Sequence, residues 1–194
     1  MKLEKAKELL WKMCVGILFF FTGCATPINL SDGSFSYVCM PPGTQFSVNF
    51  PVKPELTFGN WKFGKYHHLF SYYQAQYGSV IYTLKITDLE EPYQTKTEQA
   101  NVLEETLGLL VDELKKSLEK IKVETKEKQL FKGNDAIRFV FFIEEQKVEF
   151  FCDGILFFSD KDTIVFLYLQ YPKGTIRNIP LEYERFIDSY SPAV

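Results

Sequence analysis

Residues 163–170 constrain the fold more than any other part of this chain, because they are apolar on both sides. Side chains along a strand point alternately to the two faces of a sheet. Here Ile, Phe and Tyr occupy positions 164, 166 and 168, and Val, Leu and Leu occupy the positions after them. A strand that is apolar on both faces is typical of the middle of a sheet whose two faces are both covered.

Further strands are predicted before this segment, in runs rich in β-branched and aromatic side chains. Short polar connections make the later strands antiparallel neighbours, and Gly78 with Ser79 closes an earlier hairpin. Gly59 and Gly64, which flank two aromatic residues, predict a turn. The predicted strands are residues 44–50, 66–77, 80–87, 122–131, 136–143 and 147–158, together with 163–170.

The period of the apolar residues changes between residues 95 and 121. Six of them recur at spacings of three or four, which places them on one side of an amphipathic helix. Glu side chains come early in this segment and Lys side chains come late, as the helix dipole favours. A second, shorter helix is predicted over residues 180–190. The apolar stripe of the first helix consists of Leu103, Leu107, Leu110, Leu114, Leu118 and Ile121.

These elements together predict the α+β class. The strands form a mostly antiparallel sheet, and the helices cover its faces. Of the 194 residues, 46% are hydrophobic, which suits one folded domain with a short appendage.

The N-terminal segment has the order of a secretion signal. Residues 1–12 carry four Lys against two Glu, and residues 13–22 carry no charge. This uncharged run is too short for a membrane-spanning helix, which needs about 20 apolar residues. It suits the apolar core of a signal peptide.

The four residues Phe21-Thr22-Gly23-Cys24 resemble the lipobox of bacterial lipoproteins. The resemblance implies cleavage before Cys24 and attachment of a diacylglycerol, with fatty acyl chains such as palmitate, to its thiol. Because Ala25 follows the cysteine, the resemblance also implies passage to the outer membrane, with the protein facing the periplasm. The alternative is an uncleaved N-terminal helix that tethers a cytoplasmic protein to the membrane.

Two further motifs resemble the PsbP-like family. Residues 43–54 (GTQFSVNFPVKP) are similar to the opening of PsbP-like domains, and residues 185–190 (RFIDSY) are similar to the helix that closes them. The resemblance implies an α/β/α sandwich and indicates no reaction. The predicted organisation is a signal peptide over residues 1–23, a tether over residues 24–42 and a PsbP-like domain over residues 43–194.

Composition and motifs argue against several functions. The net charge is −3 and the basic residues are scattered, which argues against nucleic-acid binding. His67 and His68 are neighbours on a strand and point to opposite faces, which argues against a metal site. We therefore expect no metal, no cofactor and no catalytic residue, although an enzyme stays an alternative. The leading hypothesis is a lipid-anchored cell-envelope protein with a non-catalytic binding or scaffolding role.

The first hairpin is rich in tyrosine, which offers a large rigid contact area with a polar tip. One interpretation is a surface for a protein partner in the envelope. Another is that these side chains pack between the sheet and its cover. A third is a pocket under the hairpin that holds a small ligand or an active site. The candidate partner residues are Tyr66, Tyr72, Tyr73 and Tyr77.

Two cysteines stay in the domain once the signal peptide and the lipid are accounted for. Cys39 and Cys152 would lie in an oxidising compartment, where a disulfide between them is possible. The alternative is that Cys152, with apolar neighbours in the sequence, is a thiol of the core.

Overall fold

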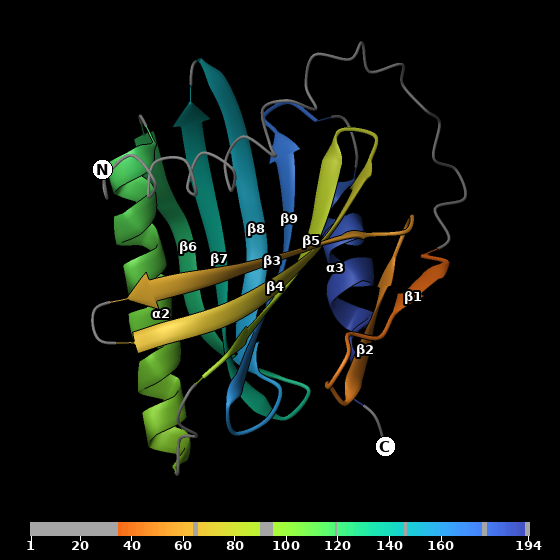
Figure 1. Ribbon diagram of the computed structural model, residues 1–194. Helices are drawn as coiled ribbons and strands as arrows, with labels where there is room; N and C mark the ends of the chain where they lie inside the picture. The colour runs from red at the N-terminus through yellow and green to blue at the C-terminus, as the bar shows by residue number, and fades with distance from the viewer. Residues whose placement is uncertain are drawn as a thin grey trace.

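Seven antiparallel strands form one sheet through the centre of the molecule (Figure 1). The computed structural model describes residues 35–63, 66–89, 95–118, 120–145, 147–175 and 178–192. The strands are β3 (Glu55–Phe63), β4 (Tyr66–Tyr77), β5 (Val80–Asp88), β6 (Lys120–Phe131), β7 (Asn134–Glu145), β8 (Val148–Phe158) and β9 (Thr163–Pro172). Their order across the sheet is β3-β4-β5-β9-β8-β7-β6.

Strand β9 is the middle strand of the seven, as its sequence predicts. It pairs with β5 on one side and with β8 on the other. Ile164 and Phe166 enter the core on one face of the sheet, and Val165 and Leu167 enter the core on the other face. All four side chains are buried, so the burial of both faces at this strand is confirmed.

Tight turns connect the strands that follow each other in the chain. Between β6 and β7, Lys132 and Gly133 have φ values of 49° and 86°. Two successive positive φ values are the pattern that matches the twist of a hairpin, and glycine adopts it without strain. The short connections therefore make antiparallel neighbours, as expected from the sequence.

One face of the sheet, called here the α3 face, is covered by helix α3 (Ile179–Asp188) and by a small second sheet. This second sheet contains β1 (Tyr37–Cys39), β2 (Phe46–Phe50) and β10 (Ser191–Pro192), in the order β1-β2-β10. Phe186 of α3 is fully buried, and its ring lies 5.3 Å from that of Phe50 and 5.4 Å from that of Tyr82, between centroids. This face is a continuous aromatic core.

The opposite face, called here the α2 face, is covered in part by helix α2 (Lys96–Ser117). Thr95 caps this helix in a capping box: its hydroxyl accepts from the Glu98 backbone N–H, and the Glu98 carboxylate accepts from the Thr95 N–H. Leu103 and Leu107 are buried against the sheet. The helix packs on β6, β7 and β8.

The structure changes three of the boundaries expected from the sequence. Helix α2 ends at Ser117 because Leu118 takes an extended conformation, so Ile121 lies in β6. The segment around Gly59 is a strand, since the whole of β3 pairs with β4. The tether is shorter than residues 24–42, because β1 pairs with β2 and Cys39 is buried.

The predicted signal peptide and Cys24 lie outside the described residues. None of the helices among the described residues has the length and apolar character that crossing a membrane would require.

Candidate ligand-binding pocket

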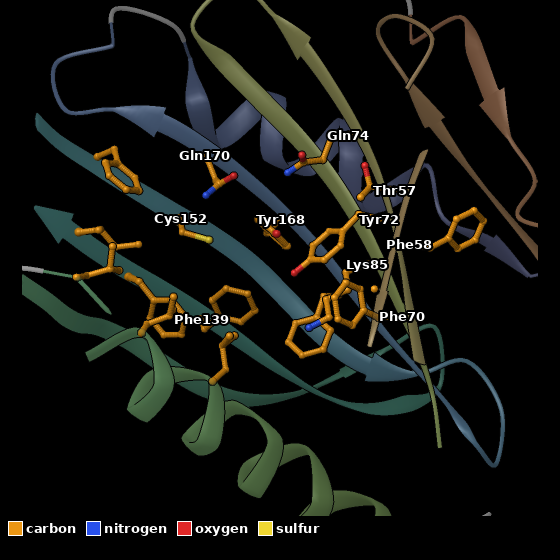
Figure 2. A pocket seen from close by; sticks show the side chains of 18 residues that line it. Thr57, Phe58, Phe70, Tyr72, Gln74, Lys85, Phe139, Cys152, Tyr168 and Gln170 are labelled. Carbon is orange, nitrogen blue, oxygen red and sulfur yellow. The ribbon is translucent and has the colours of Figure 1, made fainter. Parts of the chain in front are cut away.

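A pocket of about 230 Å³ opens on the α2 face, between helix α2 and the hairpin of β3 and β4 (Figure 2). It is larger than a cavity of about 150 Å³ that can bind benzene, and smaller than typical sites for drug-sized ligands, at roughly 300–1,000 Å³. Its described lining residues are Thr57, Phe58, Gly59, Phe70, Tyr72, Gln74, Lys85, Leu110, Leu114, Leu118, Phe139, Phe141, Ile143, Phe150, Cys152, Phe166, Tyr168 and Gln170.

The side of the pocket nearest to α2 is apolar. Leu110 and Leu114 are half-buried: they pack against the core of the α2 face and also line the cavity. Phe139 and Phe141 of β7 stack with their ring centroids 4.8 Å apart and line the same side. This wall favours an apolar ligand.

Gly154 on β8 leaves the space in which the side chains of Tyr168 and Phe139 lie. A Cβ atom there would lie 2.5 Å from the Cβ of Tyr168 and 2.7 Å from the ring of Phe139. No side chain fits at such distances without movement of its neighbours. The glycine thus allows two large pocket residues to lie over β8.

Gly59 has a similar role on the edge strand β3. The ring of Phe70 lies across Gly59, in the space that a side chain at this position would fill. Phe70 is itself buried and lines the pocket. The glycine in β3 therefore shapes the outer wall.

Polar side chains line the part of the pocket formed by β4, β5 and β9. The side-chain amide of Gln74 donates to the Thr83 hydroxyl over 3.2 Å. Burial raises the pKa of Tyr168 well above its ordinary value. In Figure 2, Tyr72 and Tyr168 gather near Lys85, while Phe139 lies on the side of the helix. The pocket thus has one polar and one apolar side.

Lys85 is the charged residue of this polar side, and only 3% of it is exposed. Its Nζ atom lies 5.0 Å from the ring centroids of Phe70 and Phe166 and 5.5 Å from that of Tyr72. Burial lowers the pKa of this amine well below its ordinary value. Three aromatic rings therefore surround a basic group at the pocket wall.

Gln170 supplies a second buried polar group. It is 8% exposed, and its Oε1 atom has no hydrogen-bond partner among the described residues. A buried acceptor without a partner costs free energy unless a donor satisfies it. Beside it in the register lies Cys152, where burial raises the thiol pKa and the nearby Asp153 charge adds to the rise, so the thiol stays protonated.

The predicted partner tyrosines do not form one exposed surface. Tyr72 lines the pocket, whereas Tyr73 points to the α3 face and is only 7% exposed. Tyr77 packs against the core of the α3 face. The side chains of Tyr66, His67 and His68 lie outside the described part of the structure. Strand alternation explains the split, because successive residues of β4 enter two different cores.

The possible disulfide is not formed. Both thiols are free and buried. Cys39 belongs to the core of the α3 face and Cys152 to that of the α2 face, so the sheet separates them. Cys152 is a core thiol, as the alternative interpretation holds.

Within the described residues, no three His, Cys, Asp or Glu side chains come together as potential metal ligands. Sequence reasoning singled out neither Lys85 nor Gln170, and it placed Gly59 in a turn and not in the pocket wall. Lys85 is one charge in the apolar run of β5, and that contrast is the signal that could have singled it out.

Comparison with solved structures identifies the fold. The structure is similar to cyanobacterial PsbP (CyanoP) from Synechocystis sp. PCC 6803, with a TM-score of 0.55 and 6% sequence identity over 89% of this chain and 98% of that chain. The fold is PsbP-like. A protein of unknown function from Pseudomonas aeruginosa, PA94, matches with a TM-score of 0.46 and 6% identity over 71% of this chain and 98% of its own.

No protein-family model matches the chain, and no curated protein matches it by sequence. The PsbP-like domain expected from residues 43–54 and 185–190 is therefore supported by the three-dimensional likeness, which at this identity concerns the fold alone.

Proposed function

We propose that this protein is a lipid-anchored binding protein of the bacterial cell envelope, which holds a small apolar ligand in the pocket of its α2 face and catalyses no reaction itself. The observation that carries the proposal is the pocket: a cavity of about 230 Å³ with an apolar wall and converging polar groups. Such a combination is typical of sites that bind small molecules.

The pocket favours ligand binding over scaffolding. A scaffolding role for the hairpin needs exposed tyrosines, but Tyr73 is buried and Tyr72 faces the cavity. The polar groups of the pocket also resemble anchors for a ligand more than reacting groups, because the Cys152 thiol and the Tyr168 phenol both have raised pKa values and stay protonated.

The proposed lipid anchor agrees with an apolar ligand. Cys24 stands only eleven residues before Phe35, which packs against the core of the α3 face. A lipid on Cys24 would keep the pocket near a bilayer, where apolar molecules concentrate. We accordingly place the protein at the outer membrane, facing the periplasm.

Filling the pocket tests the binding role. Leu110→Trp projects an indole into the cavity, and Leu181→Trp, at a 40% exposed position on α3, is the matched control. We expect a fluorescent naphthylamine dye to bind the wild type and the control, and Leu110→Trp to lose at least tenfold in affinity. Equal dye binding by all three proteins, with unchanged thermal unfolding, would remove the pocket as the binding site.

The anchor has its own test. Cys24→Ser should abolish labelling with a radioactive fatty acid and leave residues 1–23 on the chain. Mass spectrometry of the wild type should find a mature chain that begins at a diacylated Cys24. Detection of an intact Met1 together with an unmodified Cys24 would contradict the envelope location while leaving the pocket untouched.

A further inference from the structure

Lys85 lies in the interior of the sheet, where a charged residue is unusual. Strand β5 runs between β4 and β9, and Lys85 is opposite Tyr72 on the first and Phe166 on the second. On the pocket side it stands between Thr83 and Thr87, both also buried. Lysine is almost never buried to this extent, and here it also lines a cavity.

Lys85 is the feature of the pocket that most restricts the chemistry of its ligand. Among the described lining residues it is the one charged side chain; the others are apolar or neutral polar. Its Nζ atom is ringed by aromatic side chains at 5.0–5.5 Å, between nitrogen and ring centroid. A complementary ligand is therefore apolar over most of its surface and carries one acidic group.

We propose that the ligand is an apolar monocarboxylic acid of the medium-chain fatty acid class, bound with its carboxyl group at Lys85 and its chain along the apolar wall. This inference rests on the proposed binding function and names the ligand class of that same pocket. The carboxylic acid gives its proton to the buried amine, and the resulting ammonium and carboxylate form a charge-assisted hydrogen bond, which is about twice as strong as a neutral one. A cationic ligand would find no carboxylate partner here, because the described lining residues include no Asp or Glu.

The dimensions of the pocket agree with a chain of medium length. From Phe166, opposite Lys85, to Gln170 the strand β9 advances four residues, or about 13 Å at the usual rise. Both residues line the pocket. A cavity of about 230 Å³ is of a size for one such chain.

Gln170 offers a second polar group to a molecule in the pocket. Its Oε1 acceptor is buried and has no partner among the described residues. It lies at the end of the pocket away from Lys85 (Figure 2). A water molecule above the chain end, or a hydroxyl group on the chain, would satisfy this acceptor.

The test compares decanoate with decanol, which share the chain and differ in the acidic group. Calorimetric titration of the wild-type protein, below the concentration at which decanoate forms micelles, should show about tenfold or more tighter binding of the acid. Lys85→Met should reduce decanoate affinity to that of decanol and leave decanol within about twofold. Lys161→Met, at an exposed lysine in the turn before β9, is the matched control and should keep the preference.

Each outcome decides between the two proposals. Equal binding of decanoate and decanol by the wild type overturns the acidic ligand while the binding pocket stands. Retention of the acid preference in Lys85→Met assigns the preference to another group and also overturns the inference. Binding of neither compound, together with no dye binding, overturns the proposed function itself. The comparison of two ligands on the wild type needs no variant, so it decides even where Lys85→Met fails to fold.

Discussion

The two faces of the central sheet differ in how completely they are covered and in where their polar side chains lie. On the α3 face, a helix and a second sheet cover a core rich in aromatic rings. The polar side chains of Arg138, Asp153 and Tyr183 contact one another there. On the α2 face, one helix covers only part of the sheet, and the polar side chains of β4, β5 and β9 line a cavity. The same strands build both faces, with alternate residues pointing each way.

We infer from this difference that the α3 face contributes mainly to the stability of the fold and the α2 face mainly to ligand binding. A filled aromatic core supplies cohesion because each buried ring has many neighbours. A partly covered face gives up some of that packing and gains a cavity whose polar groups can select a ligand. We therefore expect substitutions on the α3 face to change mainly the free energy of unfolding, and substitutions on the α2 face to change mainly binding.

The largest expected effect is at Phe186 in the α3-face core. Phe186→Ala removes a fully buried ring that contacts Phe50 and Tyr82, so it should lower the free energy of unfolding by about 3–5 kcal/mol. Leu110→Ala, at a half-buried position on the cavity, should cost only about 1 kcal/mol. Urea denaturation measures both. Equal losses of unfolding free energy in the two variants would mean that the α2 face contributes as much to stability as the α3 face.

The polar side chains Arg138, Asp153 and Tyr183 of the α3 face should make the free energy of unfolding depend on pH. Burial raises the pKa of Asp153 from the ordinary aspartate value of 3.8 to about 6, although Arg138, 3.6 Å away between Nη2 and Oδ2, opposes the rise. The folded protein then holds this proton more tightly than the unfolded chain between about pH 4 and 6. Its contribution to stability is therefore greatest below pH 4 and is lost as the pH rises to 6, by up to about 3 kcal/mol.

Asp153→Asn isolates this contribution. The difference in unfolding free energy between wild type and variant, measured by urea denaturation at several pH values, should change between pH 4 and 6 and be constant from pH 6 to 8. Glu184→Gln, at an exposed position on α3, is the control and should show no such change. A difference that does not vary with pH in this window would contradict the buried, proton-holding state of Asp153.

Substitution by alanine of either glycine that shapes the pocket should lower the free energy of unfolding. Gly154→Ala meets the backbone oxygen of Leu167, 2.7 Å away, as well as Tyr168 and Phe139, and should cost about 1–3 kcal/mol. Gly59→Ala meets the buried ring of Phe70, which has to move and lines the pocket, so we expect a similar cost of about 1–3 kcal/mol together with a change in dye affinity. A Gly59→Ala variant with wild-type dye binding would show that Phe70 does not form the pocket wall.

Much of the sheet could be predicted because local patterns report local surroundings. The apolar residues of β9 on both faces identified the middle strand, and the change of period identified α2. The strand β3 was missed because Gly59 and Asn60 oppose strand propensity, and its stabilising partner is a ring from the next strand. No local pattern reports that partner.

The pocket could be predicted only as one of several alternatives. The tyrosines of β4 were visible in the sequence, but their division between Tyr72 on the cavity and Tyr73 in the core depends on which elements cover each face of the sheet. The burial of Lys85 could not be predicted from the local sequence either, since a lysine in an isolated strand is normally exposed to solvent. Its burial follows from β4 and β9 lying on both sides of β5, and β9 comes about 80 residues later in the chain.

The smallest expected effect on stability is at Lys85, and its sign is informative. Removing a buried amine relieves the cost of its burial, while the loss of the contacts with Phe70 and Phe166 opposes that gain. Lys85→Met keeps the length and apolar stem of the side chain, so the free energy of unfolding should stay equal or rise by about 1 kcal/mol. Thermal unfolding without ligand measures this, with Lys161→Met as the surface reference. A loss of more than about 2 kcal/mol would make Lys85 a structural residue of the sheet, whereas a gain would mean that the α2 face keeps a destabilising amine for the ligand it binds.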